Sequence, residues 1–255
     1  MTVDRHAAGI PAPDADSPAP PAPVVAPAVL GRPRRPVPRA TVARLALYLR
    51  VLTVLLADGE RVVASDTLAA STGVNAAMLR KDLSLIGSSG VRGVGYDVAR
   101  LTAQVEQVLG LTRAHAVAVV GVGNLGHALA GYGGFIDRGF PVTALFDTDP
   151  TLVGTRIGGP AVPDGPDGGI EVLHVDDLAP VCAERGVTIG VVAVPAHAAQ
   201  HVCDRFVAAG VRSILNFAPT VLAVPLGVEV RKVDLAVEMQ ILSFHVSRPT
   251  EVVGR

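Results

Sequence analysis

The spacing of apolar residues along the chain changes from helical to strand-like after about residue 112. In residues 41–57 apolar side chains recur at three- and four-residue intervals, which predicts an amphipathic helix. Two shorter helices follow: one is expected to be capped by Ser65, and the other, at residues 76–86, by Asn75. From residue 116 onward, short runs rich in valine alternate with helical segments, which is typical of an open, mostly parallel, doubly wound sheet.

The first apolar run of the second half ends in a glycine motif. A predicted strand at 116–120 leads into Gly-x-Gly-x-x-Gly, and a predicted helix spans 124–137. The first glycine allows a tight turn, the second lets backbone amides approach a pyrophosphate, and the third lets the helix pack close to the strand. Because strand, motif and helix occur in this order, the pattern predicts a dinucleotide site. Its motif residues are Gly121, Val122, Gly123, Asn124, Leu125 and Gly126.

An acidic residue at the end of the next predicted strand favours one cofactor. The strand at 142–146 ends in Asp147. A carboxylate there accepts hydrogen bonds from a ribose 2′-hydroxyl and repels a 2′-phosphate, so we predict NAD(H) rather than NADP(H). Asp149 adds a second negative charge, although it also suits the turn before Pro150.

The N-terminal part has the pattern of a winged helix-turn-helix domain. One face of the helix at 76–86 is apolar, and the opposite face carries cationic and hydroxyl side chains. The segment 87–96 then holds four glycines around an arginine, which predicts a hairpin wing over a DNA minor groove. The residues that we expect to contact DNA are Arg80, Lys81, Ser84, Arg92 and Gly93.

The charges are distributed unequally between the two parts of the chain. Residues 32–100 hold eleven Lys and Arg against five Asp and Glu, whereas residues 101–255 hold ten against fifteen. A basic domain joined to an acidic one suggests a polyanionic partner for the basic part. A solvated basic face without a partner is the alternative.

Composition narrows the remaining possibilities. No apolar run approaches the length that spans a bilayer, and the N-terminus lacks the pattern of a secretory signal, so we expect a cytoplasmic protein without a membrane partner. Cys182 and Cys203 form no ligand cluster, and the seven histidines are scattered, so we predict buried, reduced thiols and no metal.

These observations predict five segments. They are a disordered tail at 1–38 with ten of the twenty prolines, a winged-helix domain at 39–100, a linker helix at 101–111, a Rossmann domain at 112–233, and a C-terminal helix and tail at 234–255. The helix at 234–245 is expected to be apolar on one side, with no later element to cover it.

Several further motifs occur together in this chain. They are Arg80-Lys-Asp-Leu-Ser84, Arg92-Gly-Val-Gly-Tyr96, Gly121 to Gly126, Ala193-Val-Pro195, Leu215-Asn-Phe-Ala-Pro219 and Val233-Asp234. The resemblance that they carry is to one known family, the Rex redox-sensing transcriptional repressors, and it runs from about residue 38 to residue 245. It implies a homodimeric repressor that binds double-stranded operator DNA, an inverted repeat, and is released by NADH. It also implies that the last helix is exchanged between subunits, and it adds Pro195 to the cofactor site.

The resemblance further implies a switch network of Arg50, Tyr132 and Asp234, which couples the state of the nicotinamide to domain orientation. The alternatives are a surface cation for Arg50, packing between helix and sheet for Tyr132, and an ordinary helix cap for Asp234. The chain departs from the family at residues 85–89, where the family usually has aromatic residues.

Two other classes of protein remain as alternatives. An NAD-dependent oxidoreductase needs an acid or base near the nicotinamide, and His197 is the best candidate. However, only about 130 residues follow the glycine motif, so no second substrate domain fits, and we assign no catalytic residue. A structural NAD-binding protein is the third possibility, against which the face with Arg80 and Lys81 argues.

Overall fold

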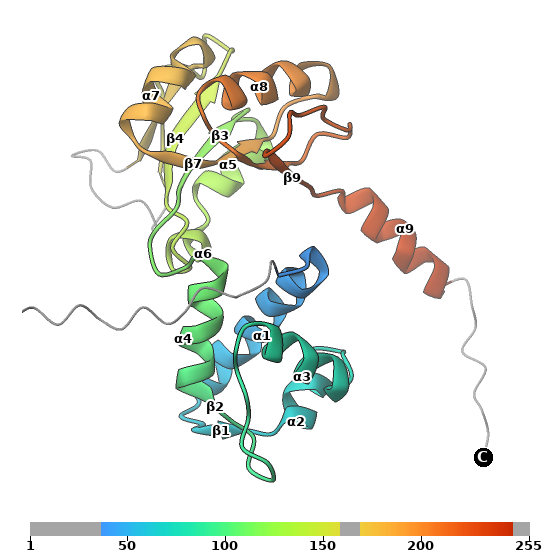
Figure 1. Ribbon diagram of the computed structural model, residues 1–255. Coiled ribbons are helices and arrows are strands. Elements are labelled where there is room, and N and C mark those ends of the chain that lie inside the picture. Colours follow the sequence, from blue (N-terminus) through green and yellow to red (C-terminus); the bar gives the residue numbers. More distant parts are fainter. Residues whose placement is uncertain (1–36, 159–168, 247–255) are drawn as a thin grey trace, which may run out of the picture.

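The fold consists of two domains connected by a helix, with a further helix that projects from the end of the chain (Figure 1). The computed structural model describes residues 37–158 and 169–246. The tail predicted at 1–38 therefore lies, except for its last two residues, outside the described residues. The N-terminal domain contains α1 (Arg39–Ala57), β1 (Val62–Val63), α2 (Ser65–Ser71), α3 (Ala76–Leu85), β2 (Tyr96–Asp97) and α4 (Val98–Leu109).

The core of the N-terminal domain is formed by apolar side chains on its four described helices. Leu45 and Leu52 of α1, Leu79 of α3 and Leu101 and Val105 of α4 are all buried in one cluster. We expected a linker helix at 101–111, but α4 begins earlier, at Val98, and is a core helix of this domain. The physical reason is that the apolar stripe of α4 needs a cover, which α1 provides.

Helix α1 is longer and more apolar than our expectation for this chain allowed. Among the described helices it alone has the length and mean hydropathy, 1.7, that would allow it to cross a membrane. Our statement that no apolar run approaches that length is therefore wrong. The domain core explains the inner face of this helix, where Leu45, Tyr48 and Leu52 are fully buried. On the rest of the helix, apolar side chains such as Leu47 and Val54 are 47% and 56% exposed.

The predicted wing is present as a hairpin. Strands β1 and β2 pair antiparallel, and a bridge joins Val91 to Gly95 within the loop between α3 and β2. Gly95 has φ +116°, and a Cβ at this position would overlap the carbonyl group of Val63. Glycine is therefore required where the wing crosses β1.

The second domain is built on a seven-stranded sheet in the order β5-β6-β4-β3-β7-β8-β9. Neighbouring strands are parallel except β5, which pairs antiparallel with β6. The strands are β3 (Ala116–Val120), β4 (Val142–Asp147), β5 (Arg156–Ile157), β6 (Ile170–His174), β7 (Val187–Val192), β8 (Ser213–Asn216) and β9 (Glu229–Lys232). The prediction of a doubly wound parallel sheet is confirmed.

Helices cover the two faces of the sheet unequally. Helices α7 (Leu178–Glu184), which follows a 3₁₀ turn at Val175–Asp177, and α8 (Ala196–Ala208) bury one face, where Cys182 and Cys203 are free and buried. On the other face lie α5 (Asn124–Ala130) and α6 (Gly133–Ile136).

The single helix that we predicted at 124–137 is wrong, because it is interrupted between α5 and α6. Tyr132 adopts an extended backbone with φ −79° and ψ 102°. Three glycines, at positions 131, 133 and 134, surround it. Glycine loses more conformational freedom in a helix than other residues, so this segment has little tendency to continue one.

Helix α9 (Leu235–Val246) leaves β9 and projects into solvent (Figure 1). Seven of its apolar side chains are between 44% and 85% exposed. They are Leu235, Val237, Met239, Ile241, Leu242, Phe244 and Val246. Positions one and two residues apart point in different directions on a helix, so the apolar surface is not confined to one side as we expected.

Candidate DNA interface and dinucleotide site

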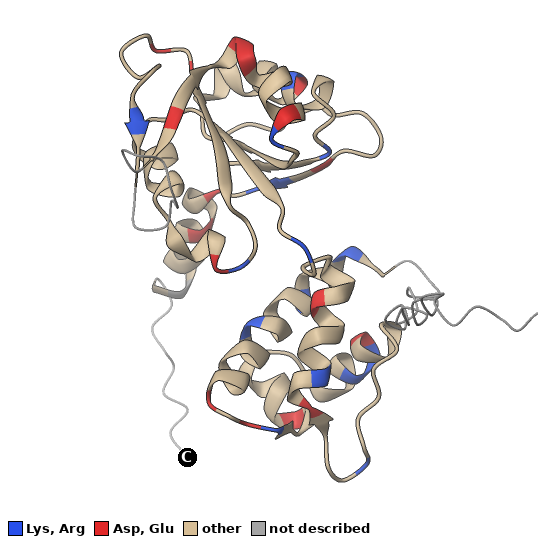
Figure 2. Cartoon of the chain, turned by 90° about the vertical axis from the view of Figure 1, so that its left-hand side faces the viewer, with Lys and Arg blue, Asp and Glu red and all other residues tan. Residues whose placement is uncertain are grey.

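Helix α3 presents the predicted DNA-contacting residues to solvent. Asn75 caps the helix, because its Oδ1 accepts a hydrogen bond of 2.8 Å from the backbone N–H of Met78. Leu79 and Leu83 are fully buried, whereas the exposed side of the helix carries Arg80, Lys81 and Ser84. Figure 2 shows basic segments on several helices of this domain and at the tip of the wing.

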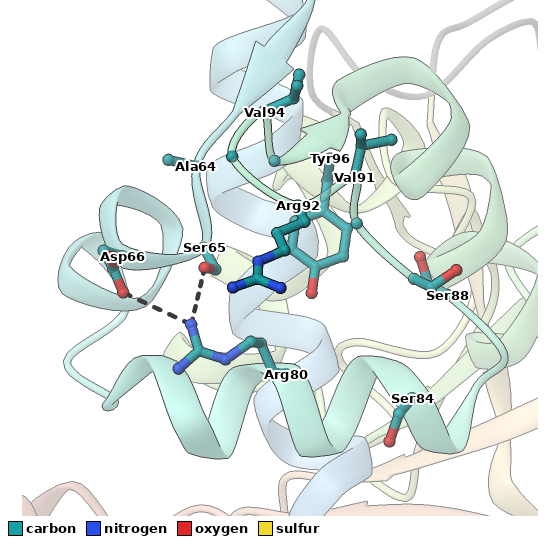
Figure 3. A pocket seen from close by; sticks show the side chains of 14 residues that line it. Ala64, Ser65, Asp66, Arg80, Ser84, Ser88, Val91, Arg92, Val94 and Tyr96 are labelled. Atoms are coloured by element: carbon teal, nitrogen blue, oxygen red, sulfur yellow. Dashed lines mark hydrogen bonds and ion pairs between the residues drawn. The ribbon is translucent and has the colours of Figure 1, made fainter.

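A cavity of about 600 Å³ separates α3 from the wing, and we call it the interface hollow (Figure 3). It is lined by residues 64–66 at the start of α2, by Arg80 and Ser84 of α3, and by residues 88–96 of the wing. Both Arg80 and Arg92 project into it, and Gly93 belongs to its rim. The structure thus brings four of the five predicted DNA-contacting residues around one hollow, with Lys81 beside it on α3.

The side chain of Arg80 is held at one end of the hollow. Its Nη1 donates a hydrogen bond of 3.0 Å to Ser65 Oγ and lies 3.8 Å from Asp66 Oδ1. We expected Ser65 to cap α2, but it is the first residue of the helix, and its hydroxyl makes no capping bond. The hydroxyl instead accepts from Arg80 because the start of α2 faces the middle of α3.

A buried carboxylate that the sequence analysis missed fixes α3 against α1. Asp82 is 1% exposed and accepts hydrogen bonds from Thr41 Oγ1 at 2.9 Å, from Arg44 Nε and Nη2 at 2.6 and 2.8 Å, and from the Tyr48 hydroxyl at 2.9 Å. We call these four residues the Asp82 network. The signal in the sequence was that Asp82 lies three residues after Leu79, in line with the buried stripe of the helix.

The network explains how a charge is tolerated in the core. Burial would raise the pKa of Asp82, but the hydrogen bonds from Arg44, Tyr48 and Thr41 outweigh it, so the pKa lies below its usual value. Burial together with the hydrogen bond to Asp82 raises the pKa of Tyr48 to about 12. At neutral pH the network is therefore a charged pair with two neutral donors, and it holds the exposed side of α3 in a fixed orientation.

The three glycines of the dinucleotide motif differ in what surrounds them. Gly121 has φ +94°, and a Cβ there would be 2.5 Å from the carbonyl oxygen of Ala193. A Cβ on Gly126 would overlap the carbonyl oxygen of Gly121, whereas a Cβ on Gly123 would meet nothing within 4 Å. Turn geometry and packing thus explain the first and third glycines, and Gly123 leaves open space where a ligand can approach the backbone.

Asp147 lies directly beside the glycine motif. Its Oδ2 accepts a hydrogen bond of 2.7 Å from the N–H of Val122, and its Oδ1 accepts from the N–H groups of Thr148 and Asp149 at 2.7 and 3.0 Å. A carboxylate has about four acceptor positions, so one remains for a ribose hydroxyl. The carboxylate of Asp149 instead accepts from Thr151 Oγ1 and N–H, which lowers its pKa and makes it a turn residue.

The remaining predicted cofactor residues lie at the same edge of the sheet. Asn124 and Leu125 begin α5, and Pro195 precedes α8 after the end of β7. In parallel sheets, ligands bind outside the carboxyl ends of the strands. His197, the candidate acid or base of the oxidoreductase alternative, is exposed in the first turn of α8.

The structure does not join the three proposed switch residues within one chain. Arg50 is exposed on α1. Tyr132 is 51% exposed and packs edge-on against Phe135, with ring centroids 5.0 Å apart, so it is not packed between helix and sheet. Asp234 accepts from the N–H groups of Ala236 and Val237 at 3.2 and 3.3 Å, and its pairing with Lys232 at 2.9 Å lowers its pKa.

The fold and the two sites define a class of protein, a DNA-binding regulator with a dinucleotide-binding domain. Residues 36–84 match a family model described as the N-terminus of a putative DNA-binding protein, and residues 112–220 match a model described as a CoA binding domain.

Known relatives identify the family. The redox-sensing transcriptional repressor Rex of Streptomyces griseus is 56% identical over 224 residues, which cover 86% of this chain and 85% of the relative. Rex of Syntrophobacter fumaroxidans is 44% identical over 211 residues, 83% of this chain and 96% of its own. The chain therefore belongs to the Rex family of redox-sensing transcriptional repressors.

Solved structures agree with this assignment. The structure of RSP, a Rex-family repressor, in complex with NAD⁺ and operator DNA has a TM-score of 0.75 and 32% identity, and covers 84% of this chain and 94% of RSP. The complex of RSP with NADH has a TM-score of 0.72 and 31% identity, and covers 84% and 96%.

Proposed function

We propose that this protein is a cytoplasmic repressor that binds operator DNA, senses the ratio of NADH to NAD⁺, and is released from DNA by NADH. The observation that carries the proposal is the presence, in one chain, of a basic winged helix and of a glycine motif flanked by Asp147. RSP has been crystallised with NAD⁺ and operator DNA and separately with NADH, which supports the same pairing of ligands here.

The test is a gel shift with full-length protein on an inverted-repeat operator recovered by selection from a random DNA pool. NADH added at constant protein concentration should release the DNA, whereas NAD⁺ should not. Release by both cofactors, or by neither, would contradict the proposal. Incubation of NADH with oxidised small metabolites should show no cofactor turnover, because the protein is a sensor and not an oxidoreductase.

For DNA recognition we propose that α3 enters the major groove and the wing the minor groove. Arg80, Lys81 and Ser84 would contact base edges and phosphates, and Arg92 and Gly93 would follow the minor groove. The interface hollow between them would then hold the sugar-phosphate strand that separates the two grooves.

For cofactor choice, replacing Asp147 with alanine should weaken NADH binding about tenfold, because a charge-assisted hydrogen bond is lost. The preference for NADH over NADPH should narrow at the same time, since the 2′-phosphate is no longer repelled. Titration of both cofactors by fluorescence gives the ratio of affinities. Asp149→Ala is the matched control, because Asp149 faces Thr151. An unchanged ratio in Asp147→Ala would show that the carboxylate does not face the ribose.

We further propose a homodimer in which α9 of each chain packs against the partner chain. The face of the sheet that carries α5 and α6 has an apolar groove of about 370 Å³, lined mainly by residues of β3, β7 and β8 together with Phe135 and Phe140. The exposed apolar surface of α9 matches this groove in chemistry. A symmetric dimer would present two copies of α3 to an inverted repeat.

Within such a dimer, Arg50, Tyr132 and Asp234 would form the switch network across subunits. Operator DNA must weaken NADH binding by the same factor by which NADH weakens DNA binding, and coupling of roughly 1–3 kcal/mol is typical. Tyr132→Phe should reduce this factor more than it reduces operator affinity, because the hydroxyl is removed but the ring stays. NADH affinity is measured with and without saturating operator for both variants, and an equal coupling factor in both would exclude Tyr132 from the switch.

A further inference from the structure

The interface hollow contains one acidic side chain among its basic and hydroxyl groups. Asp66 lies in the first turn of α2, and its side chain is 85% exposed. Figure 3 shows that its carboxylate and the hydroxyl of Ser65 point to the same guanidinium nitrogen of Arg80. A negative charge on a surface that faces DNA opposes phosphate binding, so its position needs a reason.

The geometry gives that reason through Arg80. The Arg80 side chain is 54% exposed, and a long exposed side chain samples many rotamers unless contacts hold it. The contacts to Ser65 and Asp66 are made by Nη1, and within the described part of the chain no hydrogen bond is present at Nε or Nη2. An arginine fork that is already oriented makes a bidentate contact with guanine at a lower entropic cost.

Asp66 is expected to weaken the binding of non-specific DNA. Binding without base contacts depends on phosphate neutralisation alone, so a carboxylate 3.8 Å from the Arg80 guanidinium reduces the positive charge available. A phosphate that approaches the hollow in a wrong register is also repelled. One side chain therefore favours the specific complex and disfavours the unspecific one.

We propose that Asp66 is a positioning residue that sets operator selectivity by orienting Arg80 and screening its charge. This inference rests on the proposed DNA-binding function and adds a determinant of specificity to it.

The experiment compares Asp66→Asn with wild type in full-length protein without cofactor, on the selected operator and on a scrambled duplex, over 50–200 mM salt. The ratio of operator affinity to scrambled-duplex affinity should fall about threefold to tenfold. This size is expected because an exposed ion pair is weak, and its loss changes both affinities in opposite directions. Binding to the scrambled duplex should strengthen, and its salt dependence should steepen by up to about one in the log–log slope.

Three further variants make the test specific. Asp66→Glu should keep the wild-type ratio, and Glu60→Gln removes a carboxylate outside the hollow and should also keep it. In an Arg80→Ala background, Asp66→Asn should leave the ratio unchanged, because its effect passes through Arg80. Thermal melting confirms that each variant is folded.

Two results would overturn the inference. The first is an Asp66→Asn variant whose ratio of operator affinity to scrambled-duplex affinity is unchanged or increased. The second is that Asp66→Asn lowers this ratio equally in the Arg80→Ala background, which would mean that Asp66 acts only at the start of α2 and not through Arg80. If the wild-type protein does not bind the operator, the proposed function itself is contradicted, so the two failures are distinguishable.

Discussion

Replacement of Asp82 with alanine is expected to destabilise the N-terminal domain by about 3 kcal/mol or more, because the other residues of the Asp82 network lose the buried carboxylate to which they donate hydrogen bonds. Arg44, whose side chain is 24% exposed, would lose its carboxylate partner, and the hydroxyls of Thr41 and Tyr48 would lose their acceptor. Operator affinity should fall as well, since α3 is no longer fixed on α1. Urea unfolding of the full chain and operator titration measure the two effects.

The matched control is Asp58→Ala. Asp58 is an exposed carboxylate after the end of α1, and its replacement should change stability by no more than about 0.5 kcal/mol. A loss in Asp82→Ala no larger than in the control would show that the buried network contributes nothing.

The same network predicts a dependence of stability on pH. The pKa of Asp82 is lower in the folded chain than in the unfolded chain, where it is about 3.9. Its contribution is therefore fully present above about pH 4 and is lost as the pH falls through the lower folded value. The difference in unfolding free energy between wild type and Asp82→Ala should shrink between pH 7 and pH 2. A constant difference over this range would mean that the carboxylate is not stabilised by its donors.

Removal of residues 234–255 is expected to convert the proposed dimer into monomers or aggregates and to reduce operator affinity by about a hundredfold or more. The reason is that the two copies of α3 in the proposed dimer would bind the two half-sites of the operator together, and a monomer lacks this gain in affinity. Sedimentation and operator titration at micromolar protein concentration measure both changes.

A milder variant separates loss of the dimer from loss of the fold. Leu242 is 56% exposed on α9, so Leu242→Lys places a charge on its apolar surface and should weaken the proposed dimer while both domains remain folded. Leu226→Lys is the control, because Leu226 is fully exposed in the segment before β9. Full-length protein that is monomeric at micromolar concentration would contradict the exchanged-helix dimer.

Much of this protein was determined by local sequence. The glycine motif, the strand before it and Asp147 after the next strand predicted the sheet and the dinucleotide site, because turn geometry and the approach of a helix to a strand depend on residues within a few positions. Asn75 predicted the start of α3 for the same reason. The motifs from Arg80 to Asp234 also predicted the Rex family, which the relatives confirm.

Tertiary structure decided what depends on residues that are distant in the sequence. Asp82 looked like one more polar residue of α3, and its role appears only when Thr41, Arg44 and Tyr48 are packed against it. The contact of Asp66 with Arg80 likewise requires the crossing of α2 and α3.

The same limit explains the errors in the helices. We predicted a linker helix at 101–111 and a helix apolar on one side at 234–245, but an apolar helix surface does not by itself specify which element covers it. Helix α4 packs against α1 within its own domain, whereas α9 is exposed in the single chain. Hydrophobic burial is non-directional, so the partner of each surface is chosen by the whole fold and not by the segment that carries it.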